Sequence, residues 1–94
     1  VKERIMIGRA DPVADYHPDF DLTPYGGQEN GVSRRHAVII REENGLYVEA
    51  LQAVNGTRIN GTLLETGQRY RLRDGDEMAL GRLRIVVRFV RSPF

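Results

Sequence analysis

Four turn-forming dipeptides limit what this 94-residue chain can fold into more than any other feature of its sequence. They are Asn44-Gly45, Asn55-Gly56, Asn60-Gly61 and Asp74-Gly75. Asparagine, aspartate and glycine tolerate the positive backbone φ angles that two-residue hairpin turns require. Because such turns interrupt the second half of the chain at short intervals, they predict several short strands joined by tight turns.

The apolar pattern between the turns is that of strands. In the last stretch the apolar residues share one face of an extended chain and the arginines share the other: Leu83, Ile85, Val87 and Phe89 against Arg82, Arg84 and Arg88. Shorter strand-like runs cover residues 5–7, 37–40, 46–49 and 69–73. No 11-residue window carries an apolar stripe of period 3.6, so we expect no long helix. The predicted fold class is all-β, as an antiparallel β-sandwich.

One long irregular segment separates the first strand-like run from the second. It covers residues 10–32 and holds three of the four prolines and a glycine-rich tip at residues 26–31. We expect a short strand near residues 21–23 inside it. Connections in compact domains are mostly shorter than about 12 to 15 residues, and longer ones often serve a function.

The composition is that of one folded domain and excludes several function classes. There is no cysteine, which rules out disulfides and thiolate metal sites and fits a cytoplasmic chain. The two histidines have no spacing that pairs them with carboxylates, so we expect no metal and no cofactor. No apolar run approaches the roughly 20 residues that span a bilayer, so we expect no membrane partner.

The charge points to an anionic ligand other than nucleic acid. The formal net charge is only +1, whereas nucleic-acid-binding domains usually carry a larger basic excess. Of the 14 basic residues, 13 are arginine, whose planar fork suits bidentate binding of carboxylate or phosphate. A general preference for arginine over lysine in the source genome explains the same count.

Three short motifs occur in an order that resembles the signature of forkhead-associated (FHA) domains. They are Gly8-Arg9, then Ser33-Arg34-Arg35-His36, then Asn55-Gly56-Thr57 followed by Asn60-Gly61. The stretch Leu72–Asp76, with Leu80-Gly81 after it, is similar to the closing strands of that family. The resemblance extends from about residue 5 to residue 90.

The resemblance implies a sandwich of about 10 to 11 strands whose loops at one end bind phosphothreonine in a partner protein. Arg9, Ser33 and Arg34 would bind the phosphate, and Asn55 would bind the peptide backbone. Gly8, His36 and Gly56 would support the site. The module would be a signalling adaptor and no enzyme, and residues 1–94 would form one domain excised from a larger protein.

His36 follows Ser33 closely enough to suggest a catalytic pair. On an extended segment, residues three apart place their side chains on opposite faces, whereas a nucleophile and its base need hydrogen-bond contact. In the family this histidine is structural, and we expect the same here. For Asn60-Gly61 we expect a hairpin turn without ligand contact.

The sequence departs from the family at three places. Val54 replaces a Ser or Thr whose hydroxyl helps to hold the phosphate loop, which should weaken phosphate binding by about 1 kcal/mol. Ala50 and Ala53 replace a usual Asp and Ser. Few residues precede Gly8, so we expect the first family strand to be missing here or supplied by another chain. A sheet edge left open in this way could pair with a second copy.

Two alternatives to the phosphothreonine adaptor remain. The same fold could serve as a protein-interaction or self-association module that does not require phosphate. Nucleic acid could bind to the arginines of the last strand, Arg82, Arg84 and Arg88. Selectivity for residues around the phosphothreonine would come from the 26–31 tip and from residues 52–54.

Overall fold

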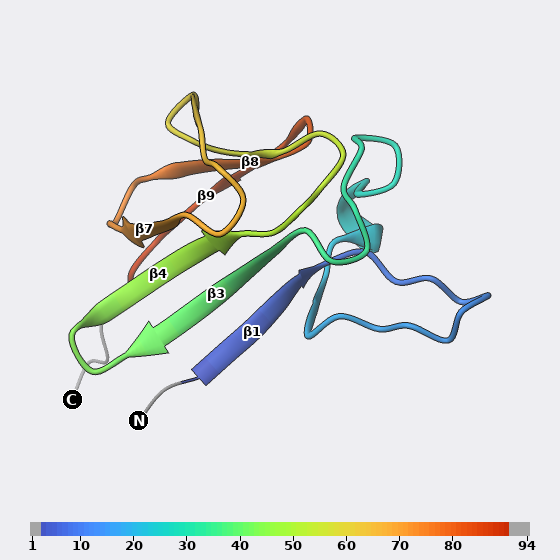
Figure 1. The fold of residues 1–94 in the computed structure, drawn as a ribbon, viewed down its shortest axis with the longest axis horizontal. Coiled ribbons are helices and arrows are strands. Elements are labelled where there is room, and N and C mark those ends of the chain that lie inside the picture. Colours follow the sequence, from blue (N-terminus) through green and yellow to red (C-terminus); the bar gives the residue numbers. More distant parts are fainter. Residues whose placement is uncertain (1–2, 91–94) are drawn as a thin grey trace.

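The computed structural model describes residues 3–90 and shows two β-sheets packed face to face (Figure 1). The first sheet has the order β2-β1-β3-β4-β7 and consists of β1 (Glu3–Gly8), β2 (Phe20–Asp21), β3 (Ala37–Glu42), β4 (Gly45–Ala50) and β7 (Arg69–Leu72). The second has the order β6-β5-β8-β9 and consists of β5 (Thr57–Ile59), β6 (Thr62–Leu63), β8 (Glu77–Leu80) and β9 (Leu83–Val86). The one helical turn among residues 3–90 is a 3-10 helix, η1 (Thr23–Tyr25). The predicted all-β sandwich is confirmed. The described residues form nine strands, fewer than the 10 to 11 that the family resemblance implies.

The core lies between the two sheets and follows the period-2 pattern of the strands. Ala37 and Ile39 of β3 point into it, and Val48 of β4 is fully buried beside them. Ile59 and Leu80 contribute from the opposite sheet. Burial of a side chain of this size contributes roughly 1.5–3 kcal/mol, so these alternating positions stabilise the sandwich.

The turn predictions hold best at Asn60-Gly61. Both residues have positive φ, 50° and 86°, and they close the β5–β6 hairpin in which Ile59 pairs with Thr62. The expected strand at residues 21–23 is shifted: β2 ends at Asp21 and runs parallel to β1, and η1 follows it. Pro24 lies in the first turn of η1, where its fixed φ is tolerated and its missing N–H costs nothing.

The last apolar stretch is a strand for part of its length. Leu83, Ile85 and Val87 pack against the core, but the side chain of Phe89 remains 48% exposed. Beyond Val86 the chain follows the β7–β8 turn, where Gly75 donates its N–H to the Val87 carbonyl at 2.7 Å. The predicted alternation is therefore right at three of its four apolar positions.

The N-terminal strand is not the edge of its sheet. β1 lies between β3 and β2, although β2 pairs only with Ile7 and Gly8. Among residues 3–90, no strand pairs with the β2 side of β1 before Ile7. On β1 the Met6 N–H instead donates to the Asp19 carboxylate at 2.8 Å. Pairing with a second copy stays a prediction, and residues 1, 2 and 91–94 lie outside the described part. The described residues contain no helix that is long and apolar enough to cross a membrane.

Candidate functional site

Three connections meet at one end of the sandwich, at the right of Figure 1. β3 is antiparallel to both β1 and β4, so the end of β1, the start of β3 and the end of β4 lie together. The connections border an open pocket of about 650 Å³. Its lining includes Arg9, Tyr16, Ser33, Arg34, Arg35 and Val54.

The three predicted phosphate ligands all line this pocket. Arg9 follows the last residue of β1, and its Nε donates to the Val32 carbonyl at 2.8 Å. Arg34 is exposed, and its Nη1 lies 3.1 Å from the Asp11 carboxylate. Each guanidinium therefore has one donor engaged by the protein, and the remaining N–H groups of the fork can serve an anion.

Ser33 is hydrogen-bonded both to the loop that carries Val54 and to His36. Its Oγ accepts the Val54 N–H at 3.3 Å, and its own backbone N–H donates to Nδ1 of His36 at 2.9 Å. No described residue accepts the hydroxyl hydrogen of Ser33. A serine hydroxyl both donates and accepts, so this one can still donate to a ligand in the pocket.

His36 is completely buried and holds two loops by hydrogen bonds. Because Nδ1 accepts the Ser33 N–H, the network assigns the ring hydrogen to Nε2, which lies 2.8 Å from the Gly56 carbonyl. Burial lowers the pKa of the His36 imidazole, and the bond to Gly56 opposes this in part. The ring is therefore neutral at pH 7.

Ser33 and His36 do not form a nucleophile and base. The expectation of an extended segment was wrong, because the chain bends at Arg34 and Arg35. The bend brings the ring back to the backbone N–H of Ser33. No hydrogen bond joins the Ser33 hydroxyl to the ring in the described residues, and nucleophilic catalysis needs that contact.

Asn55 lies on the exposed turn beside the pocket. Its Nδ2 donates to the Gly31 carbonyl at 3.0 Å, which ties this turn to the 26–31 tip. The side-chain oxygen has no partner among residues 3–90. The amide therefore keeps an acceptor and a second N–H, the two groups that an extended peptide backbone can use.

The two supporting glycines lie where a side chain has no room. A Cβ on Gly8 would lie 1.8 Å from the carbonyl oxygen of Arg34. Gly56 has a φ of 75°, and a Cβ there would lie 2.7 Å from a methyl carbon of Leu63. Close approach at Gly8 and backbone conformation at Gly56 both require glycine.

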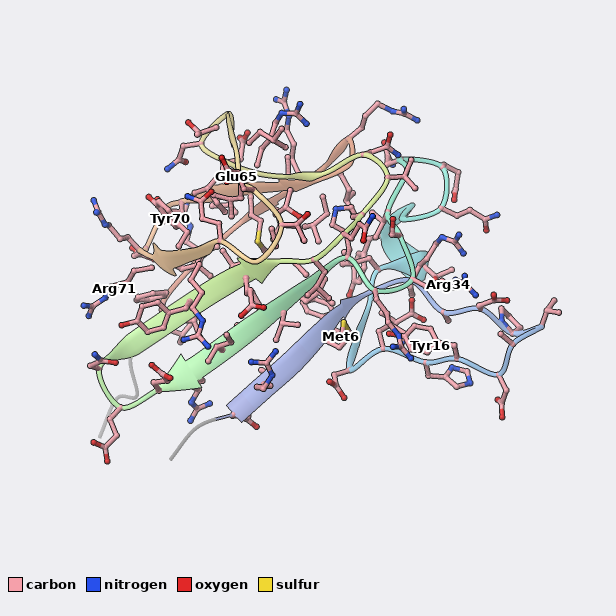
Figure 2. The ribbon with its side chains drawn as sticks, in the orientation of Figure 1. Met6, Tyr16, Arg34, Glu65, Tyr70 and Arg71 are labelled. Atoms are coloured by element: carbon pink, nitrogen blue, oxygen red, sulfur yellow. The ribbon has the colours of Figure 1, made fainter. Side chains whose placement is uncertain are left out.

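The sequence analysis missed the contribution of the loop at residues 11–16. This 11–16 loop closes on itself through two backbone hydrogen bonds of 2.9 Å between Asp11 and Tyr16. Figure 2 shows Tyr16 and Arg34 on the same side of the molecule. The guanidinium of Arg35 lies 5.3 Å from the centre of the Tyr16 ring, a cation–π contact that adds a third arginine to the pocket. The second arginine of the Ser-Arg-Arg-His motif was the only local signal.

In the described part of the chain, no three His, Asp or Glu side chains lie close enough to hold a metal ion.

Known proteins with similar sequences and folds were found in three comparisons. The FHA domain family model matches residues 5–81. Protein FraH of Nostoc sp. is 43% identical over 65 residues, which cover 69% of this chain and 22% of FraH. The glycogen accumulation regulator GarA of Mycobacterium tuberculosis is 32% identical over 83 residues, which cover 88% of this chain and 48% of GarA. The chain thus spans less than half the length of both curated relatives.

Among solved structures, an FHA domain from a study of phosphothreonine-dependent FHA domain interactions superimposes with a TM-score of 0.73. It is 30% identical and covers 95% of this chain and 79% of its own.

Proposed function

We propose, from the fact that this chain belongs to the FHA domain family, that its loop end binds a phosphothreonine-containing segment of a partner protein. The observation that carries the proposal is the pocket in which Arg9, Ser33 and Arg34 meet, with Asn55 beside it. FHA domains are binding modules whose partners are proteins and peptides, so the proposed role is that of an adaptor and no enzyme.

A phosphate dianion needs several donors because one exposed ion pair contributes only about 0–1 kcal/mol. The fork of Arg9 and the guanidinium of Arg34 supply charged donors, and the Ser33 hydroxyl supplies a neutral one. Charge-assisted hydrogen bonds contribute roughly 1.5–3 kcal/mol each. Two or three of them contribute roughly 3–9 kcal/mol before the ordering cost of association is subtracted. Contacts to the peptide backbone and to neighbouring residues must therefore add to them if the affinity is to be micromolar, about 8 kcal/mol.

Asn55 would hold the peptide backbone next to the phosphothreonine. Its free side-chain oxygen can accept a peptide N–H while its second amide hydrogen donates to a peptide carbonyl. The bond that Asn55 already makes to the Gly31 carbonyl orients the amide before the ligand arrives. Less side-chain entropy is then lost on binding.

Binding to a degenerate phosphothreonine peptide library tests this proposal, with phosphoserine and unphosphorylated libraries beside it. We expect micromolar binding that requires the phosphate. Arg9→Ala should weaken it by at least about 2 kcal/mol, roughly thirtyfold, because the dianion loses a main donor.

Arg41→Ala is the matched control, since Arg41 is 72% exposed on β3 and lies outside the pocket. Equal affinities of Arg9→Ala and the unchanged protein would remove Arg9 from the site. Binding that ignores the phosphate would refute the proposed function.

A phosphate-independent protein-interaction role is the second candidate. The observation that favours it is the pairing of Arg34 with Asp11, which already engages one donor of a guanidinium that we propose to bind phosphate. The unphosphorylated library separates the two roles, because only this second role predicts that it binds equally well.

A further inference from the structure

The 26–31 tip is held by a row of hydrogen bonds from other loops. The carbonyl groups of Glu29, Asn30 and Gly31, three in succession, each accept a donor from outside the tip. Arg82 supplies two of them, from Nη2 to Glu29 at 2.7 Å and from its backbone N–H to Asn30 at 2.8 Å. The third comes from Asn55 to Gly31 at 3.0 Å.

The turn between β8 and β9 joins the tip to the Asn55 loop. Gly81 of this turn donates its N–H to the Gly56 carbonyl at 3.1 Å, and the next residue, Arg82, holds the tip. A Cβ on Gly81 would lie 2.5 Å from the Asn30 carbonyl oxygen, so the backbones approach as closely as glycine permits. The dipeptide Gly81-Arg82 therefore fixes the spacing between two loops that border the site.

This arrangement leaves one part of the tip available to a ligand. The side chains of Gln28 and Glu29 are exposed, and their backbone N–H groups have no acceptor in the described part of the chain. The carbonyl groups of Glu29, Asn30 and Gly31 are bonded to other loops, which holds the backbone of the tip in place. The tip thus presents an acidic and an amide side chain on a backbone that is ordered in advance.

We propose that Arg82 is a positioning residue that fixes the 26–31 tip, so that Gln28 and Glu29 select the peptide residues beside the phosphothreonine. The inference rests on the proposed function and adds the residue that holds the 26–31 tip in place, which the sequence analysis does not identify. Arg82 does not line the phosphate pocket, so its removal should leave the phosphate contacts in place. Ordering a loop before binding lowers the entropy lost on association, and losing this order costs about three- to tenfold in affinity.

The test compares the peptide-library profiles of Arg82→Ala and of the unchanged protein. We expect Arg82→Ala to keep its requirement for phosphate, to bind about three- to tenfold more weakly, and to lose preference at the positions that contact the tip. Glu29→Gln should alter preference at those same positions. Arg82→Lys should recover part of the selectivity, because an ammonium group can also donate to the Glu29 carbonyl.

Arg84→Ala is the matched control, because Arg84 is exposed on β9, just after the turn that carries Arg82, and its guanidinium lies 3.8 Å from the Glu77 carboxylate. Its profile should equal that of the unchanged protein. Should Arg82→Ala fail to fold, Arg82→Gln takes its place, since it keeps most of the side-chain stem and removes the charge.

Two failures can be told apart. If the unchanged protein shows no phosphothreonine-dependent binding, the proposed function is lost, and this inference with it. If it binds and Arg82→Ala keeps both its affinity and its profile, the proposed function stands and the role of Arg82 is refuted. An Arg84→Ala profile as altered as that of Arg82→Ala would also overturn the inference.

Discussion

A buried imidazole joins the loop that carries Ser33 to the turn that carries Gly56. His36 accepts the Ser33 N–H on one ring nitrogen and donates to the Gly56 carbonyl from the other. Both bonds can exist together only in the neutral ring, because a protonated Nδ1 cannot accept. Acid therefore removes the bond to Ser33 and places an uncompensated charge in the core.

The first prediction concerns the dependence of stability on pH. Burial lowers the pKa of His36 in the folded protein, while the unfolded chain keeps a pKa of about 6.5. Below that pH the unfolded chain binds more protons, so stability falls as pH decreases toward the folded pKa, by at most about 1.4 kcal/mol per pH unit. Urea unfolding between pH 7.5 and 5 measures this slope.

His36→Asn is the control for that slope, because the amide oxygen can replace Nδ1 as an acceptor and does not titrate. Its free energy of unfolding should be nearly constant between pH 6.5 and 5. A slope as steep as that of the unchanged protein would assign the effect to another group. Carboxylates affect stability at lower pH than His36 does. Hydrogen bonds, the strongest from the Thr23 hydroxyl, lower the pKa of Asp21. The stability that Asp21 contributes is therefore lost only as pH falls below about 4.

The second prediction concerns Val54, which stands where the family usually has a hydroxyl. Its side chain is 92% exposed beside Ser33 and lines the pocket, so replacing it does not disturb the core. Val54→Thr should strengthen phosphothreonine peptide binding by about 1 kcal/mol, roughly fivefold, through one added neutral hydrogen bond. Isothermal titration calorimetry measures the gain. Val54→Ala controls for the loss of the apolar side chain, and a gain of the same size there would contradict the explanation.

At the scale of an element, one side chain reinforces the backbone pairing that joins the β5–β6 hairpin to β8. Asn60 donates from Nδ2 to the Asp76 carboxylate at 2.9 Å and accepts the Glu77 N–H at 2.9 Å. Its φ of 50° adds a conformation that few residues other than glycine and asparagine adopt. Two hydrogen bonds lower the pKa of Asp76: the stronger effect comes from the Asn60 side chain and the next from the Arg73 N–H.

The third prediction follows from this hairpin. Asn60→Ala should lower the free energy of unfolding by about 2–3 kcal/mol, from two lost hydrogen bonds and a strained φ. Asn60→Gly should lose less, because it removes the bonds but relieves the backbone. Chemical denaturation ranks the variants, with Asn44→Ala as the control from another turn. Phosphopeptide affinity should be unchanged in Asn60→Ala, and a large loss would bring this turn into the site.

At the scale of the whole molecule, local sequence predicted those features that arise from local chemistry. The turn at Asn60-Gly61 and the alternation of Leu83 and Ile85 depend on residues close together in the chain. The position of β2 differs from the prediction because residues 21–23 could either continue a strand or start a helical turn. The Asp21 carboxylate accepts the Thr23 N–H at 2.9 Å, and η1 begins at Thr23. The sequence alone does not decide between these two conformations.

Contacts between distant segments were out of reach of the sequence. The pair of Arg34 with Asp11 and the bond from Arg82 to Glu29 join residues 23 and 53 positions apart. The residues around these two arginines form no pattern that distinguishes them from the other arginines. The sequence therefore did not predict which partners they would bond. The motif order placed Arg9, Ser33 and Arg34 in one pocket, while the 11–16 loop that shares that pocket carries no pattern of its own.

The most direct test of the central claim is to map the binding of a phosphothreonine peptide onto the backbone by ¹H–¹⁵N NMR. We expect the largest shifts at the amides of Ser33, Arg34, Val54 and Asn55, and none from the unphosphorylated peptide at the same concentration. The amides of the β3–β4 turn at residues 43–44 should not move, because that turn lies at the opposite end of the sandwich (Figure 1). Shifts that centre on another surface, or that are the same with and without phosphate, would contradict the account.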